Sequence, residues 1–338
     1  MPTNLHDRVA LGVDVGGSKI AAGLVDSAGS ILYQTRVPMP SRGTPEAAFG
    51  AVQSAINCVF AANPQTRAGL AGIGLCAPGP LDPRTGVILN PPNVPCWRNF
   101  PLADEIRRMF DLAARVDNDG NAAALAEAIW GAGVGHRNVF YATIGTGIGT
   151  GIIFDRRIYH GRTGSAAEGG HLSIDYRGPR CGCGKPGCIE ALASGPAIAR
   201  RARDRIAKVG QRKAPPGEPP LSRSKLLALA GGDPNAVTAE IVAEAFRQGD
   251  PLAKEVLQET ADFLAIWAGN VIDLLEPDIF IFGGGVAQVM SGFFSRILEQ
   301  LPKWCVNSRC REIPLVLAKY GPDAGIAGAA ALCFSQTS

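Results

Sequence analysis

Several features that mark particular classes of protein are missing from this sequence of 338 residues. No basic run exceeds a few residues and the formal net charge is only +3, so neither nucleic acid nor an anionic membrane is expected as a partner. No run of about 18 apolar residues occurs, and Met1–Leu11 lacks the apolar core of a signal peptide. The sequence therefore predicts a protein that stays in the cytoplasm.

A disulfide framework is missing as well. Of the nine cysteines, three lie in one short stretch and six are scattered, which is consistent with a reducing compartment. The residue present in excess is glycine, with 42 positions, and this predicts many tight turns and loops able to cradle phosphate. The length favours two domains, because a single hydrophobic core usually stops growing at about 250 to 300 residues.

The most specific pattern is a group of one histidine and three cysteines. The thiols of Cys181, Cys183 and Cys188 are separated by Gly and Pro residues that let the backbone wrap around one small ion. With His171 as fourth ligand, this Cys3His set predicts a structural Zn²⁺ ion, because a closed tetrahedron leaves no position for a reacting water. The alternatives are a redox pair or reduced cysteines in a loop, although redox motifs use Cys-x-x-Cys.

Two glycine-rich turns have similar surroundings. The pattern of strand, glycine and hydroxyl turn, and strand occurs at residues 9–25 and again at residues 138–154. The turns are Gly16-Gly17-Ser18-Lys19 and Gly145-Thr146-Gly147, whose backbone N–H groups would point at an anion, which predicts two similar halves with a phosphate loop each. A plain hairpin is the alternative for the first turn. A Rossmann site is the alternative for the second, but it needs a helix directly after the glycines.

Acidic and amide residues gather where a strand is predicted to meet a helix. The strand covers residues 115–117 and the helix residues 122–130, with Asp119 between them. The helix dipole favours an ionised carboxylate, and Asn118 and Asn121 can supply hydrogen bonds, so Asp119 is a candidate to accept a proton from an attacking hydroxyl group. A simple N-cap is the alternative.

The remaining patterns complete an α/β chain. Strands are predicted at residues 31–37, 70–76, 278–282 and 314–319, and helices at residues 46–61, 191–209, 225–230, 237–247, 251–275, 288–301 and 321–334. The last helix, rich in small residues, is expected to pack against the N-terminal part of the chain. The loop at residues 89–97, with amides and Trp97 on a proline-rich backbone, suits a sugar pocket but is also typical of ordinary loops. Residues 211–223 are predicted to form a surface loop with solvated charges.

Together these motifs resemble the ROK family of sugar kinases (repressors, open reading frames and kinases), within the actin-like ATPase superfamily. The motifs occur in the family's order and are Asp14-x-Gly-Gly-Ser-Lys, Asn118-Asp119-x-Asn121, Gly145-Thr-Gly-Ile-Gly, Glu168-x-Gly-His171 and Cys181-x-Cys-Gly-x-x-Gly-Cys188-x-Glu190. The resemblance covers nearly the whole chain and implies a two-lobed α/β fold with mixed sheets and a structural zinc site. We expect a small lobe of residues 1–118 plus 322–338, and a large lobe of residues 119–321 that carries the zinc motif and a dimerisation surface.

The resemblance also implies a role for each motif. Asp119 would be the general base that deprotonates the primary hydroxyl of a sugar for attack on the γ-phosphate of ATP, and Asp14 would orient Mg²⁺ or its waters. The residues expected to bind the sugar are Gly79, Asn93, Asn118, Asp119, Glu168, His171 and Glu190. The residues expected to bind the nucleotide are Asp14, Gly16, Gly17, Ser18, Lys19, Thr146, Gly147, Gly283, Gly284 and Gly285. His171 would place one ring nitrogen on zinc and the other toward the sugar.

The preferred sugar is specified less closely. Glu168-Gly-Gly-His171 and Pro92-Asn93 resemble bacterial glucokinases, which makes glucose, and hence glycolysis, the leading interpretation. Residues 116–121 and 321–325 are also similar to N-acetylhexosamine kinases acting on GlcNAc or ManNAc. A sugar-responsive repressor is disfavoured, because only 13 residues precede Asp14 and the catalytic Asp119 is retained. The family resemblance further implies a homodimer or homotetramer.

Overall fold

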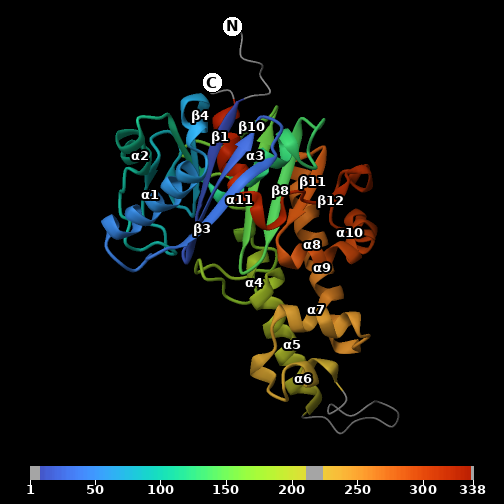
Figure 1. Cartoon of the computed structure of the whole chain (residues 1–338). Helices are drawn as coiled ribbons and strands as arrows, with labels where there is room; N and C mark the ends of the chain where they lie inside the picture. Colours follow the sequence, from blue (N-terminus) through green and yellow to red (C-terminus); the bar gives the residue numbers. More distant parts are fainter. Residues whose placement is uncertain (1–7, 211–223, 336–338) are drawn as a thin grey trace. The chain divides into compact units, whose positions relative to one another are not determined.

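The computed structural model describes residues 8–210 and 224–335 (Figure 1). Within these residues the chain forms two compact units. The first contains the segment that ends at Ala142, the segment Thr150–Glu168 and the segment that begins at Ala318, and the second contains Thr143–Gly149 and Gly169–Leu317. The loop predicted at residues 211–223 lies outside the described residues.

In the described part of the chain, the strands form two five-stranded mixed sheets and one small two-stranded sheet. The first sheet has the order β3-β2-β1-β4-β7, the second β10-β9-β8-β11-β12 and the third β5-β6. The strands are β1 (Val9–Val15), β2 (Lys19–Asp26), β3 (Ile31–Pro38), β4 (Leu70–Ala77), β5 (Leu81–Asp82), β6 (Val87–Ile88), β7 (Ala114–Asn118), β8 (Asn138–Ile144), β9 (Ile148–Phe154), β10 (Arg157–Ile158), β11 (Ile279–Gly283) and β12 (Leu315–Leu317).

The α-helices connect and cover these strands. In chain order they are α1 (Pro45–Ala62), α2 (Leu102–Phe110), α3 (Asp119–Trp130), α4 (Ile189–Ala193), α5 (Gly195–Gly210), α6 (Lys225–Leu229), α7 (Ala239–Arg247), α8 (Pro251–Leu275), α9 (Gly285–Met290), α10 (Phe294–Gln300) and α11 (Ala324–Phe334). The predicted α/β class with mixed sheets is therefore confirmed, as are both strand pairs that enclose the glycine-rich turns.

Two predicted helices are divided in the structure. The helix predicted at residues 191–209 is in fact α4 and α5, because Ser194 between them has an extended backbone and Pro196 cannot donate a backbone hydrogen bond. The helix predicted at residues 288–301 begins earlier, at Gly285, and a 3-10 turn at Ser291–Phe293 separates α9 from α10.

The central strand of the first sheet, β1, shows why the chain forms a layered unit. Its side chains alternate between the two faces of the sheet. Leu11 and Val13 join a buried apolar cluster that includes Val52 and Ile56 of α1. Ala10, on the alternate register, belongs to a separate cluster with residues of α11. One helix therefore covers each face.

The C-terminal helix α11 packs against β1, β4 and α3, which confirms the packing predicted for the small-residue helix (Figure 1). This close approach requires glycine. A Cβ atom on Gly12 would lie 2.1 Å from the carbonyl oxygen of Ile326, and one on Gly74 only 1.7 Å from that of Ala329. Backbone of sheet and helix thus meet without side chains between them.

Candidate active site

Three parallel strands of the first unit end at the same edge of its sheet, and a candidate residue lies at or just after each end. In the register of β1, β4 and β7, Asp14 pairs with Cys76 and Cys76 pairs with Asp117. Asp14 lies near the end of β1, Gly79 follows β4, and Asp119 follows β7. The carboxyl ends of parallel strands are where open α/β sheets commonly bind ligands, so the fold brings these residues to one edge.

The helix cap at this edge is Asn118 rather than Asp119. The Asn118 side chain accepts a hydrogen bond from the backbone N–H of Gly120 at 2.9 Å, and its backbone is extended, as an N-cap residue requires. Asp119 is the first residue of α3, and its Oδ1 accepts from the same N–H at 2.8 Å. Since Asn118 provides the cap, the carboxylate of Asp119 is left for another use.

Asp119 is an exposed residue, although many protein atoms lie near its carboxyl group. Burial raises its pKa to about 6, and the charges of Asp14 and Glu168 act in the same direction, while the hydrogen bond from Gly120 opposes the rise. A carboxyl group with this pKa is ionised at neutral pH and is a better base than an ordinary aspartate.

Asp14 is the second carboxylate at the edge. Burial raises its pKa, and it accepts a hydrogen bond from the Cys76 thiol at 3.5 Å. Gly325 at the start of α11 leaves room for it, because a Cβ there would lie 2.4 Å from the Asp14 carboxyl group. Among the described residues Asp14 has no ion pair, and such a carboxylate suits a hard cation with oxygen ligands such as Mg²⁺.

Glu168 is exposed and ends the segment Thr150–Glu168 of the first unit. The residue before it, Ala167, is contacted by a side chain of the sheet. The buried Thr150 hydroxyl of β9 donates to the backbone carbonyl of Ala167. Ala167 has a positive φ of 65°, which is uncommon for a residue with a side chain. The threonine hydroxyl therefore stabilises an unfavourable backbone conformation at Ala167, and this conformation fixes the position of the following residue, Glu168.

The first glycine-rich turn packs against the loop that carries Asn93. A Cβ on Gly17 would lie 2.8 Å from the carbonyl oxygen of Asn93, so glycine is needed here for packing between the two loops. Ser18 and Lys19 are exposed. Trp97 of the same loop does not offer a surface to a sugar. It is fully buried, stacks on Phe100 with 4.9 Å between ring centroids, and belongs to the core.

In the second unit, Glu190 supports the second glycine-rich turn. Its Oε2 accepts from the backbone N–H of Ile148 at 2.9 Å, and a Cβ on Gly147 would lie 2.6 Å from the same oxygen. Its Oε1 lies 3.4 Å from the Cys181 thiol. Glu190 thus joins the turn to the cysteine cluster, while Thr146 in the turn is exposed.

Two contacts position the residues between Glu168 and His171, and one of them requires glycine. Gly169 accepts a hydrogen bond at its carbonyl from the buried Trp267 indole, 3.0 Å away. A Cβ on Gly170 would lie 1.9 Å from the carbonyl oxygen of Ile148. These contacts place His171 beside the cysteines.

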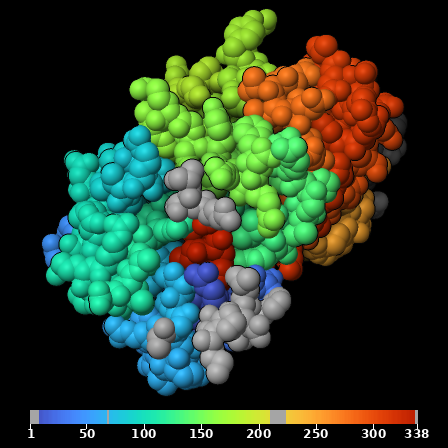
Figure 2. Space-filling model, turned by 90° about the horizontal axis from the view of Figure 1, so that it is seen from above, coloured from blue at the N-terminus to red at the C-terminus, as the bar shows by residue number. Residues whose placement is uncertain are grey.

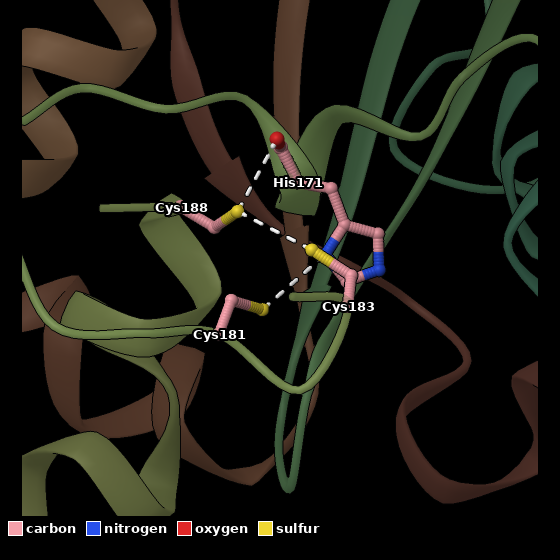
Figure 3. Close-up of side chains that lie close together, drawn as sticks. All are labelled: His171, Cys181, Cys183 and Cys188. Atoms are coloured by element: carbon pink, nitrogen blue, oxygen red, sulfur yellow. Dashed lines mark hydrogen bonds between the residues drawn. The ribbon is translucent and has the colours of Figure 1, made fainter. Parts of the chain in front are cut away.

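The structure brings His171, Cys181, Cys183 and Cys188 together, as the spacing predicted (Figure 3). Their ligand atoms all lie within 4.8 Å of one another, with 3.6 Å from Cys181 Sγ to His171 Nδ1 and 3.6 Å between the sulfurs of Cys183 and Cys188. Tetrahedral Zn²⁺ bonds of about 2.3 Å to sulfur and about 2.0 Å to nitrogen separate neighbouring ligand atoms by roughly 3.5 to 3.8 Å. The donor set and its dimensions therefore fit Zn²⁺. In Figure 3 the second ring nitrogen of His171 points away from Cys181 and Cys188.

A cavity of about 780 Å³ in the second unit adjoins the second glycine-rich turn, at residues 145–147. Gly145, Thr146, Gly195 and Gly285 line it, together with residues of α5 and α7. Gly284 has φ of 86°, and a Cβ there would lie 2.3 Å from the carbonyl oxygen of Ile144, so no other residue fits. The volume is in the range of small-molecule sites and is large enough for a nucleoside.

One pair of residues was missed by sequence reasoning. His160 Nε2 lies 2.6 Å from Oδ2 of the buried Asp117, whose Oδ1 accepts from the backbone N–H of Asn118 at 2.7 Å and from the Asn121 side chain at 3.0 Å. Burial opposes the charged form of His160, but the hydrogen bond and charge of Asp117 outweigh it and raise the His160 pKa. No pattern around residue 160 indicated this contact across 43 positions.

Comparisons with known proteins agree with this arrangement. The ROK family model matches residues 10–336. The glucokinase of Streptomyces coelicolor is 35% identical over 325 residues, which cover 96% of this chain and 97% of that protein. The crystal structure of a ROK family glucokinase from Streptomyces griseus, in complex with glucose and AMPPNP, has a TM-score of 0.77 at 34% identity and covers 96% of this chain and 98% of that one.

A regulator has the same fold. The crystal structure of a ROK family transcriptional regulator, a homologue of the E. coli MLC protein, has a TM-score of 0.82 at 28% identity and covers 98% of this chain but 79% of that chain. Separately, none of the helices in the described ranges combines the length and apolar character needed to cross a membrane.

Proposed function

This chain belongs to the ROK family, and on that basis we propose that it is an ATP-dependent sugar kinase that phosphorylates the 6-hydroxyl group of glucose. The observation that carries the proposal is Asp119. It stands at the carboxyl edge of a parallel sheet, outside the helix cap, with a pKa of about 6 that suits a general base. The glucokinase relatives at comparable length support the choice of glucose.

In the proposed reaction the ionised Asp119 accepts the proton of the sugar hydroxyl group. The hydroxyl oxygen forms a bond to the γ-phosphorus of ATP while the bond from that phosphorus to the bridging oxygen of the β-phosphate breaks, and ADP leaves. Most of the acceleration in such transfers comes from positioning and from neutralising phosphate charge. Asp14 would hold the Mg²⁺ that accompanies ATP, which supplies positive charge to the phosphates.

The other assignments follow the family motifs. The residues that would bind the sugar hydroxyls are Gly79, Asn93, Asn118, Glu168, His171 and Glu190. The backbone of the turns at residues 16–19 and 145–147 would bind phosphate, and Gly283–Gly285 would hold the adenosine. The 780 Å³ cavity that Gly285 lines supports this last assignment.

The proposed zinc would stabilise the segment that carries His171 and Glu190 without taking part in the reaction. Its four ligands leave no open position, and the closed site would order the loop from residue 171 to residue 188. Because His171 directs Nδ1 toward the cysteines, its other nitrogen stays available for a substrate hydroxyl.

The experiment that tests the function is ATP-dependent release of ADP by the purified, zinc-loaded protein with Mg²⁺. Glucose, N-acetylglucosamine, N-acetylmannosamine, fructose and a blank without sugar are compared. Preference for glucose supports the proposal, and preference for an acetamido sugar replaces the substrate but keeps the mechanism. Turnover with none of them would contradict the kinase proposal and favour a regulatory role like that of the ROK family transcriptional regulator. Size measurement in solution tests the proposed homodimer or homotetramer.

A further inference from the structure

The first unit contains a second cavity, of about 570 Å³, whose lining is strongly basic. Asp119 does not line it. Its charged lining consists mainly of Arg84, Arg107, Arg115, Arg156, Arg157 and His160. Figure 2 views a hollowed face of the molecule, on which the C-terminal part of the chain, in red, is visible between teal and green segments. Leu332 and Ser335 at the end of α11 belong to this lining.

Four of these cationic side chains already have partners in the protein: His160 contacts Asp117, Arg115 donates to the backbone carbonyls of Leu332 and Ser335, and Arg84 and Arg107 form ion pairs. Arg84 pairs with Asp82 and Arg107 pairs with Asp104, at 3.2 and 2.6 Å. In the part of the chain that the structure describes, Arg156 has no carboxylate partner, and the same is true of Arg157. The sole lining carboxylate, that of Asp117, is buried and already accepts hydrogen bonds from its own neighbours.

The two unpaired arginines project from a short, well-defined turn. Asp155 and Arg156 connect β9 to β10 with φ of 50° and 64°, the left-handed backbone of a tight two-residue hairpin. An ion pair between Asp155 and Arg137 at 2.5 Å anchors this turn. The turn therefore brings two arginines without a carboxylate partner to the edge of the cavity, where they leave positive charge for an anion.

We propose that this cavity binds a phosphorylated small molecule. Planar guanidinium groups recognise phosphate by paired hydrogen bonds, and the two arginines of the lining without a carboxylate partner, Arg156 and Arg157, match a ligand with at least two negative charges. The volume exceeds that of a phosphate ion and falls in the range for small-molecule ligands, so the ligand has a body as well as a charged group. A sugar phosphate and an oligophosphate share this chemistry.

The cavity is connected to the helix that carries Asp119. His160 lines the cavity and contacts Asp117, and Asp117 holds the backbone N–H of Asn118, the cap of α3. An anion that draws His160 toward itself weakens the contact to Asp117 and loosens the start of α3. Binding therefore lowers turnover without competing with ATP.

Titration calorimetry of the full-length protein tests the binding, with glucose 6-phosphate and tripolyphosphate as separate probes. The double substitution Arg156→Ala and Arg157→Ala should lower the affinity for the tighter-binding probe at least tenfold. Arg108→Ala is the matched control, since Arg108 is an exposed arginine of α2 that pairs with Glu105 and does not line the cavity. The stronger probe identifies which kind of phosphate the cavity prefers.

The proposal would be overturned if neither probe binds. It would also be overturned if the double substitution leaves the affinity unchanged, as it would if the probes occupy only the proposed nucleotide site. This binding test does not depend on kinase activity. Where turnover is measurable, the probe should lower kcat at saturating ATP in the wild type, and His160→Gln should remove that effect. Inhibition that ATP relieves would refute the connection to α3.

Discussion

The pKa of about 6 at Asp119 makes the proposed reaction depend on pH in a measurable way. Catalysis needs the ionised carboxylate, so activity falls as protons bind. For a base with this pKa, kcat/KM at pH 5 should be about a tenth of its plateau value above pH 7. An aspartate with the ordinary pKa of 3.8 would stay almost fully ionised at pH 5 and show no such decline.

The charges that raise this pKa can be changed one at a time. Glu168→Gln removes a negative charge that acts on Asp119, so the decline in kcat/KM should move to lower pH, whatever happens to KM. Glu312→Gln is the control, because Glu312 pairs with Arg309 and is not among the charges that raise the Asp119 pKa. A profile that stays flat to pH 5, or one that Glu168→Gln leaves in place, would show that Asp119 does not set the pH dependence.

The base itself is tested by Asp119→Asn, which keeps the size of the side chain and removes its ability to accept a proton. We expect kcat to fall by about 10²- to 10⁴-fold while sugar binding, measured by calorimetry, persists. A near-normal rate would exclude Asp119 as the general base.

Three further substitutions test the supports of the site. Thr150→Val removes the hydroxyl that donates to Ala167 and should raise the sugar KM several-fold, whereas Thr150→Ser keeps the hydroxyl and should not. Equal KM values for Thr150→Val and the wild type would contradict this role. Cys183→Ser should lose bound zinc and sugar affinity together, with Cys58→Ser, at an exposed free thiol, as control; sugar affinity that survives metal loss would separate the two. Gly74→Ala should lower the free energy of unfolding by about 1 to 3 kcal/mol, because its Cβ meets α11 backbone. Gly50→Ala should raise the free energy of unfolding by about 0.5 to 1 kcal/mol, because Gly50 lies in α1 with open space around it and alanine favours a helix. Denaturant unfolding measures both variants.

Local patterns in the sequence were enough to predict most of the longer helices and strands and the cysteine cluster. Strand periodicity and glycine turns predicted the meander of β1 to β3, and the apolar face of residues 251–275 predicted α8 with the bounds it has. The four candidate metal ligands could be recognised because three lie within one short segment and His171 precedes it closely. Chemistry confined to neighbouring residues is visible in a sequence.

Contacts between distant segments were decided by tertiary structure. Trp97 matched a sugar-binding loop in composition, but packing against Phe100 made it part of the core. Gly17 lies in a turn predicted to receive phosphate, yet the Asn93 backbone occupies the space beside it. A residue type cannot show which neighbour fills the volume next to it.

By itself, the sequence determined the α/β class, the order of the motifs and the family, because each depends on residue types at short spacing. Only the folded chain decided that Asn118 caps α3 and leaves Asp119 with a pKa of about 6. The same holds for the His160–Asp117 contact and the arginine-lined cavity. Burial, electrostatic environment and cavity shape are sums over residues far apart in the chain, which no local pattern contains.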